Sequence, residues 1–157
     1  MSSERSTRRI IVAGLGNIFL GDDAFGVEVV KRLVRDALPE GVRVLDVGIR
    51  SVHLGYELVE GNYDVVILVD AVSRGGEPGT LYVLEPDTVG DTATEEPGGH
   101  AMRPEHIVGF AKRLGGRMGR VVIVGCEPAS IDGEAGLSDA VAGALDEATQ
   151  LVRTLCA

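Results

Sequence analysis

The segment YDVVILVDAV, residues 63–72, carries an unbroken run of apolar side chains from Val65 to Val69. A strand with one face in water alternates apolar and polar residues, whereas a strand covered on both faces is apolar throughout. Strands of the second kind are typical of parallel sheets with helices on both sides. Residues 63–72 therefore predict a central strand of an α/β fold. RIIVAGLG, residues 9–16, and RVVIVGCEP, residues 120–128, predict two further buried strands.

The stretches between these strands carry apolar residues at helical spacing. In residues 22–38 apolar side chains recur every three or four positions, and the tripeptide PEG ends the pattern. Further helices are predicted at residues 51–61, at 103–116 with Pro104 in the first turn, and at 138–155 with Ser138 or Asp139 as the N-cap. This alternation of strands and helices indicates a three-layer α/β/α sandwich around a mostly parallel sheet.

Two more strands complete the predicted sheet. The first is VRVLDVG, residues 42–48, and the second is LYVLEPD, residues 81–87. The turn RGGEPGT precedes the second strand and is too short for a parallel crossover. Residues 81–87 are therefore predicted to form an antiparallel hairpin with the strand before them.

Chain length fits a single folded unit. We expect residues 1–157 to form one domain, with residues 1–8 as a flexible N-terminal tail. Residues 88–102 are polar, rich in glycine and without periodicity, so they predict a long surface loop. Long loops in compact domains are often functional.

Charge and cysteine content argue against several function classes. The net charge of −9 would repel nucleic acids and anionic membrane surfaces. Cys126 and Cys156 form no CxxC motif, which favours a reducing compartment. No apolar run approaches the roughly 20 residues of a membrane span, and no secretory signal pattern is present. We therefore expect a cytoplasmic protein without nucleic-acid or membrane partners.

The glycine-rich segment GLGNIFLGDDAFG, residues 14–26, has the position of a phosphate-binding loop but not its spacing. Its first glycines read GxGxxxxG rather than the GxGxxG of dinucleotide-binding folds. Gly16 and Gly21 have P-loop spacing, but Asp22 and Asp23 follow where Lys and Ser or Thr are required. Two carboxylates would repel a triphosphate, so no nucleotide cofactor is expected. Asp22 is predicted to cap the following helix, a role that one aspartate can fill, which leaves Asp23 for another role.

Three polar side chains follow predicted strands at one edge of the sheet. Asp23 comes just after the first strand, Asp70 ends the strand at 63–72, and His100 ends the stretch EEPGGH. Ligands bind at the carboxyl ends of parallel strands, and carboxylate and imidazole ligands suit divalent ions such as nickel or zinc. Asp70 as a loop cap and His100 as a solvated side chain are the structural alternatives.

Four segments, in order along the chain, resemble the hydrogenase maturation endopeptidases: VAGLGNIFLGDDAFGVEVVKRL, VVILVDAVSRGGEPGTLYVLEPD, GGHAMRPEHIVGFAKRLGG and VVIVGCEPASI. The resemblance runs from about Ile10 to Val152, and GLGN-x4-DD-x2-G is its most specific motif. It implies an α/β protease that removes the C-terminal tail from the large subunit of a nickel–iron hydrogenase after nickel insertion.

Carried over to this chain, the resemblance makes Asp23, Asp70 and His100 the residues that contact the nickel presented by the substrate. Asp23 or Asp70 would activate a water molecule as general base. We expect Gly98 and Gly99 to bind substrate, the hydrogenase large-subunit precursor to be the partner, and the protein to be a monomer.

Two other functions use some of the same residues. A non-enzymatic nickel-protein chaperone or adaptor would use the same three ligands without cutting its partner. A cysteine hydrolase would pair Cys126, at the end of a strand, with His100. Glu127 is assigned no catalytic role, and His106 is assigned to helix packing or solvent. Arg50 is open to two interpretations, a contact with a substrate carboxylate or a solvated loop residue.

Overall fold

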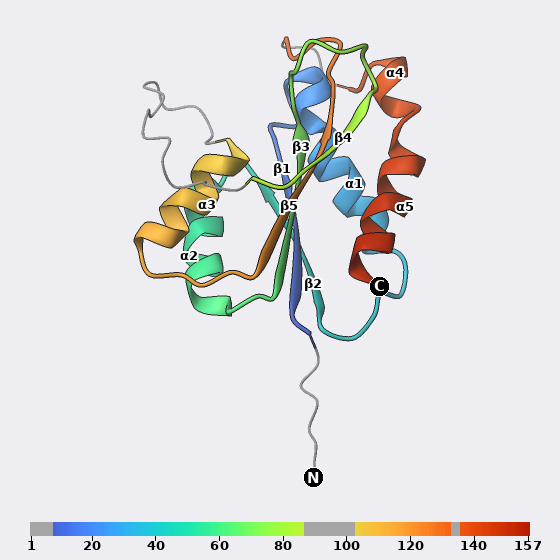
Figure 1. Cartoon of the computed structure of the whole chain (residues 1–157). Helices are drawn as coiled ribbons and strands as arrows, with labels where there is room; N and C mark the ends of the chain where they lie inside the picture. The colour runs from blue at the N-terminus through green and yellow to red at the C-terminus, as the bar shows by residue number, and fades with distance from the viewer. Residues whose placement is uncertain (1–7, 87–102, 133–135) are drawn as a thin grey trace.

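A computed structural model describes residues 8–86, 103–132 and 136–157 of the chain. Its five strands are β1 (Ile10–Leu15), β2 (Val42–Gly48), β3 (Val65–Ala71), β4 (Leu81–Leu84) and β5 (Arg120–Cys126). They form one sheet in the order β2-β1-β3-β5-β4 (Figure 1). The pairs β2–β1, β1–β3 and β3–β5 are parallel, and β4 is antiparallel to β5. The expected mixed and mostly parallel sheet is confirmed.

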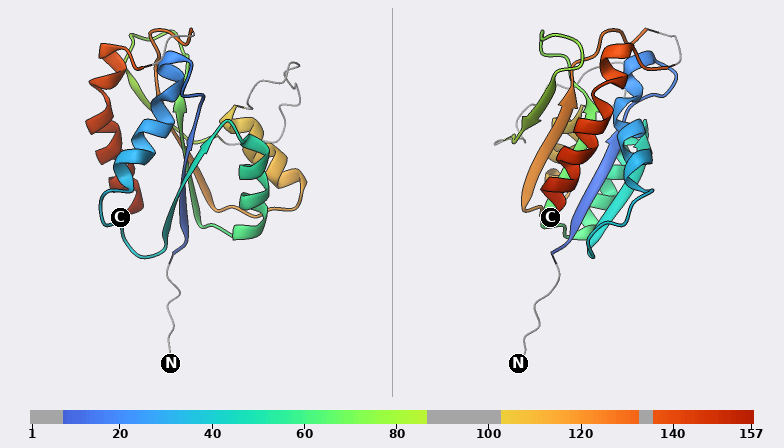
Figure 2. Two further views of the ribbon diagram at one scale, coloured as in Figure 1. Left: turned by 180° about the vertical axis from the view of Figure 1, so that it is seen from behind. Right: turned by 90° about the vertical axis from the view of Figure 1, so that its right-hand side faces the viewer.

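Helices cover both faces of the sheet (Figures 1 and 2). The helices are α1 (Phe25–Leu33), which follows the 3-10 turn η1 (Gly21–Ala24), then α2 (Ser51–Gly61), α3 (Pro104–Arg113), α4 (Asp139–Ala142) and α5 (Leu145–Cys156). On one face α1 and α5 pack against the sheet, and on the other α2 and α3 do so. The predicted three-layer sandwich is confirmed. Within the described ranges, no helix is long and apolar enough to cross a membrane.

The central strands bury alternate residues in two separate cores. Ile10 and Val12 of β1 belong to the core beneath α1 and α5, whereas Ile11 and Ala13 belong to the core beneath α2 and α3. Successive side chains of a strand point to opposite faces, so a strand between two helical layers must be apolar at every position. This is why the run in β3 is unbroken.

Two predicted helices end differently in the structure. The helix expected over residues 22–38 begins as η1, continues as α1 and ends at Leu33. The C-terminal helix is divided by a break at Gly143 into α4 and α5. Ser138 is confirmed as the N-cap of α4, because its side chain accepts a hydrogen bond from the Val141 N–H. Pro104 is likewise confirmed in the first turn of α3.

The partner predicted for β4 was wrong, although its antiparallel orientation was right. β4 pairs with β5, which lies between β4 and β3, so β3 and β4 do not form a hairpin. Residues 72–80 pass over the end of β5 to reach its far side. The Val72 N–H donates to the Cys126 carbonyl at 3.0 Å, and the Glu127 N–H donates to the Thr80 carbonyl at 2.8 Å. The connection between β3 and β4 is too short for a parallel crossover, but it is long enough to pass one intervening strand.

Candidate active site

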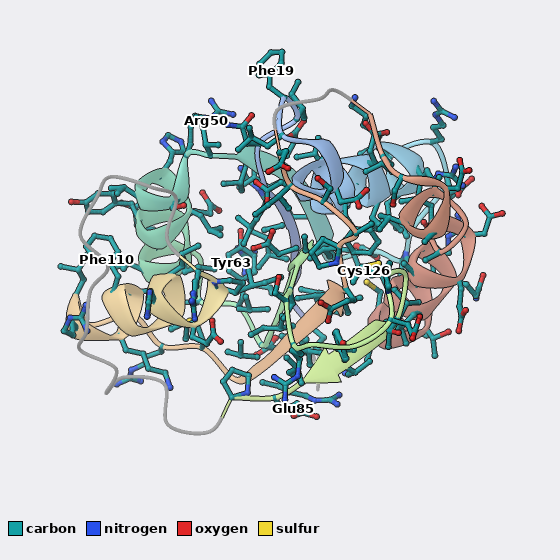
Figure 3. The ribbon with its side chains drawn as sticks, turned by 90° about the horizontal axis from the view of Figure 1, so that it is seen from above. Phe19, Arg50, Tyr63, Glu85, Phe110 and Cys126 are labelled. Atoms are coloured by element: carbon teal, nitrogen blue, oxygen red, sulfur yellow. The ribbon has the colours of Figure 1, made fainter. Side chains whose placement is uncertain are left out.

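Asp23 and Asp70 both lie at the carboxyl ends of the central strands. Asp23 is on η1, directly after β1, and Asp70 is the penultimate residue of β3. The Asp23 Oδ2 accepts a hydrogen bond from the Asn17 N–H at 2.8 Å, and the Asp70 Oδ1 accepts one from the Ala71 N–H at 2.9 Å. Both side chains are partly buried. Figure 3 views the molecule from this edge.

The turn η1, which carries Asp23, packs against β3, which carries Asp70. Burial raises the pKa of Asp70 well above its ordinary value, and the negative charge of Asp23 raises it further. The hydrogen bond from Ala71 lowers this pKa, while the charge of Glu105 adds a smaller increase. A strand-end carboxylate with a raised pKa is suited to accept a proton near neutral pH. The structure thus brings the two predicted aspartates into one region.

Glu105 has a smaller electrostatic effect on Asp70, and the sequence reasoning did not consider it. It lies in the first turn of α3 and is partly buried. An acidic residue in the first turn of a helix is ordinary, because it complements the helix dipole, so position alone gave no signal. Its proximity to Asp70 depends on how α3 packs against the sheet.

The other predicted site residues lie outside the described part of the chain. His100, Gly98 and Gly99 belong to residues 87–102, which fall between two described ranges. Among residues 8–86, 103–132 and 136–157, no three His, Cys, Asp or Glu side chains form a group that could hold a metal ion. The described chain therefore contributes paired carboxylates rather than a complete metal site.

Asp22 does not cap a helix, contrary to the prediction. Neither η1 nor α1 has a side-chain cap. The Asp22 carboxylate instead accepts hydrogen bonds from the N–H groups of Ala129, Ser130 and Ser138 and from the Ser138 hydroxyl. Asp22 is 1% exposed, and although its burial opposes ionisation, the hydrogen bonds leave its pKa below the ordinary value. Asp22 therefore connects η1 to the residues that follow β5.

The glycines of residues 14–26 allow the backbone around Asp23 to approach the sheet closely. Gly16 has φ +129°, and a Cβ there would lie 1.9 Å from the Asp23 carbonyl oxygen. Gly14 and Gly26 face each other between β1 and α1, so that a Cβ on Gly14 would lie 2.4 Å from the Gly26 carbonyl oxygen. These glycines serve close packing of η1 and α1 on the strands rather than phosphate binding.

Cys126 is poorly suited to be a nucleophile. It is fully buried at the end of β5, and Figure 3 shows it within the interior of the edge view. Burial raises the pKa of its thiol to about 11, and the charges of Asp22 and Glu127 contribute in the same direction. Only the thiolate attacks effectively, so the structure argues against the cysteine-hydrolase alternative.

Glu127 is held in a network of hydrogen bonds with the connection between β3 and β4. Its Oε1 accepts hydrogen bonds from the Tyr82 hydroxyl at 2.6 Å, the Arg74 N–H at 2.8 Å and the Gly76 N–H at 3.1 Å. The Tyr82 hydrogen bond is the main reason that the pKa of Glu127 lies below its usual value. Glu127 thereby holds the connection at residues 72–80 against β5.

The two remaining residues singled out from the sequence differ in exposure. Arg50 is exposed after β2, and its Nη2 donates to the Asp46 carbonyl at 3.4 Å. His106 is partly buried on α3.

The fold matches that of solved hydrogenase maturation proteases. The hydrogenase maturating endopeptidase HybD from Escherichia coli superposes with a TM-score of 0.80 and is 30% identical, with 94% of this chain and 91% of that chain covered. The fold is therefore HybD-like. The HycI protease from Thermococcus kodakarensis gives a TM-score of 0.76 at 27% identity, covering 94% of this chain and 92% of that one.

Sequence comparisons give the family. Residues 27–154 match the family model described as hydrogenase maturation protease (HycI). The hydrogenase 2 maturation protease of Escherichia coli is 32% identical over 146 residues, covering 92% of this chain and 88% of the relative. A putative hydrogenase maturation protease of Methanocaldococcus jannaschii is 32% identical, covering 91% and 93% respectively. This chain belongs to the hydrogenase maturation protease family.

Proposed function

We propose that this protein is an endopeptidase that removes the C-terminal extension of a nickel-loaded nickel–iron hydrogenase large subunit. Family membership supports the reaction class. The observation that carries the assignment to specific residues is that Asp23 and Asp70, 47 positions apart in the chain, lie on η1 and on β3, two elements that pack against each other. Such pairs of interacting acids are frequent at functional sites.

Asp23, Asp70 and His100 would recognise the nickel carried by the substrate. Carboxylate oxygen and imidazole nitrogen are suitable donors for a borderline divalent ion. Two carboxylates beside each other repel, and a cation relieves that repulsion. Nickel already held by thiolates of the precursor would thus bind where the free protein has excess negative charge, and this would restrict cutting to loaded substrate.

We assign the role of general base to Asp70. Burial raises the pKa of Asp70, which makes its carboxylate a stronger base than an ordinary aspartate. Asp70 would take a proton from water while the water oxygen attacks the scissile carbonyl carbon. The peptide C–N bond then breaks, and the proton passes to the leaving nitrogen. Asp23, held by the Asn17 N–H, would contact the substrate's metal.

The test is to incubate purified protein with nickel-loaded and nickel-free precursor and to measure the mass of the large subunit. Cleavage of the loaded form alone is expected, with loss of at least about 100-fold in rate for Asp23→Ala, Asp70→Ala and His100→Ala. Asp64→Asn, before the amino end of β3, and His53→Ala, exposed on α2, are matched controls that should keep the rate.

Two outcomes would contradict the proposal. An unchanged precursor mass with retained binding would favour the adaptor alternative. Full processing by Asp23→Ala or Asp70→Ala would show that the paired carboxylates are not the site.

A further inference from the structure

The two adjacent aspartates make different contacts. Asp23 is partly exposed, and among the residues that the structure describes its carboxylate accepts one hydrogen bond, from the Asn17 N–H. Asp22 is 1% exposed and its carboxylate accepts four hydrogen bonds. Since a buried carboxylate is costly unless its oxygens are paired, this number of donors indicates a built network rather than an incidental contact.

The Asp22 network joins η1 to Ala129, Ser130 and Ser138, which follow β5 and are called the post-β5 segment below. Oδ2 accepts from the Ala129 N–H at 2.8 Å, the Ser130 N–H at 3.2 Å and the Ser138 hydroxyl at 2.9 Å, and Oδ1 accepts from the Ser138 N–H at 2.7 Å. The Asp22 N–H in turn donates to the Ser130 carbonyl at 2.9 Å. η1 therefore both accepts hydrogen bonds from the post-β5 segment and donates one to it.

Ser138 extends the network into the next helix. While its hydroxyl donates to Asp22, its Oγ also accepts from the Val141 N–H at 3.3 Å, which is the N-cap contact of α4. One carboxylate thus links the turn that carries Asp23 to the start of α4. Asp23 is the next residue along the same turn, and this turn packs against β3, the strand that carries Asp70.

We propose that Asp22 is a positioning residue of the peptidase: it clamps η1 to the post-β5 segment so that Asp23 keeps its place beside Asp70. The inference rests on the proposed function. A purely stabilising role would lower the unfolding temperature without changing turnover by folded protein. A positioning role changes turnover, because displacements near 1 Å at a reacting site can cost about 100-fold in rate.

The decisive variant is Asp22→Asn. An amide keeps the shape but replaces one acceptor oxygen with an NH2 donor, which would face an N–H or hydroxyl group. With nickel-loaded precursor at a temperature where the protein is almost entirely folded, we expect kcat to fall by about 10- to 100-fold while KM stays within about threefold. Asp64→Asn is the matched control and should leave both constants unchanged.

A second variant covers the case in which Asp22→Asn does not fold. Ser138→Ala removes the hydroxyl donor but keeps the three backbone N–H donors to the Asp22 carboxylate, and should lower kcat by about three- to tenfold. Thr154→Ala, an exposed hydroxyl removal on α5, is its control. Unchanged kcat in folded Asp22→Asn, or in Ser138→Ala if Asp22→Asn is unfolded, overturns the inference. Absence of cleavage by the wild-type protein overturns the proposed function and this inference with it.

Discussion

Gly26 lies in the first turn of α1, where the helix crosses the carboxyl ends of β1 and β3. A Cβ at this position would lie 2.1 Å from the Val69 carbonyl oxygen and 2.5 Å from the Leu15 carbonyl oxygen. Both contacts are with backbone of the central strands, so no side-chain rotation can relieve them. Gly26→Ala must therefore push α1 away from the sheet by about 1 Å.

The cost of this movement can be set against the gain in helix propensity. Overpacking a well-packed interior costs about 1–3 kcal/mol, and more where backbone must move. Replacing glycine by alanine inside a helix recovers about 1 kcal/mol. Because the clash is with backbone, the upper end of that cost applies, and we expect a net loss of about 2 kcal/mol, which lowers the melting temperature by roughly 4–8 °C for a chain of this size.

Two other glycines provide graded controls. A Cβ on Gly55 would meet the ring of Phe110 at 2.4 Å, but this ring is a partly exposed side chain that can turn, so Gly55→Ala should cost only about 1 kcal/mol. Gly143 is exposed with φ −69°, and a Cβ there would come no closer than 3.3 Å to the Asp139 carbonyl oxygen. Gly143→Ala should be neutral or stabilise by up to about 1 kcal/mol.

Thermal and urea unfolding of the three variants measure this order directly. Processing by Gly26→Ala should also fall by about 100-fold under conditions where it is folded, because α1 carries the Asp23 turn with it. A Gly26→Ala protein as stable as the wild type, or less affected than Gly55→Ala, would refute the packing assignment.

Three further predictions concern single side chains. Asp70→Asn should abolish processing yet stabilise the metal-free protein at pH 7. Because the pKa of Asp70 is raised on folding, the stability of the wild-type protein falls as pH rises above the unfolded pKa of about 3.9. Urea unfolding at several pH values should therefore show that the stability advantage of the variant disappears below about pH 3.9. Cys126, with a thiol pKa of about 11, should resist iodoacetamide at about pH 8 in folded protein by mass spectrometry, and rapid alkylation with loss of activity would reopen the cysteine alternative. Tyr63→Phe should cost about 1 kcal/mol by removing the 2.6 Å hydrogen bond to Glu57. Burial raises the pKa of Tyr63 to about 12, so wild-type stability should fall between about pH 10 and 12, and an equal fall in Tyr63→Phe would contradict this.

Local sequence pattern is enough to locate much of the site. Asp23 follows β1 and Asp70 lies at the carboxyl end of β3, and because parallel strands end at the same edge of a sheet, both aspartates could be placed there from the sequence. Glu105 could not be found this way, because its approach to Asp70 depends on the packing of α3. The role of Asp22 was missed for a similar reason, since its partners lie 107 to 116 positions away.

The division between what sequence and tertiary structure determine is physical. Runs of apolar residues and helical periodicity act over a few neighbouring positions, so the sequence alone determined the strands, most helices and the α/β class. The partner of β4, the burial of Cys126 and the hydrogen bonds of Asp22 depend on contacts between segments far apart in the chain. Such contacts form only when the helical layers have packed on the sheet. The loops at the shared edge come from distant parts of the sequence, and no local pattern predicts which of them will be in contact.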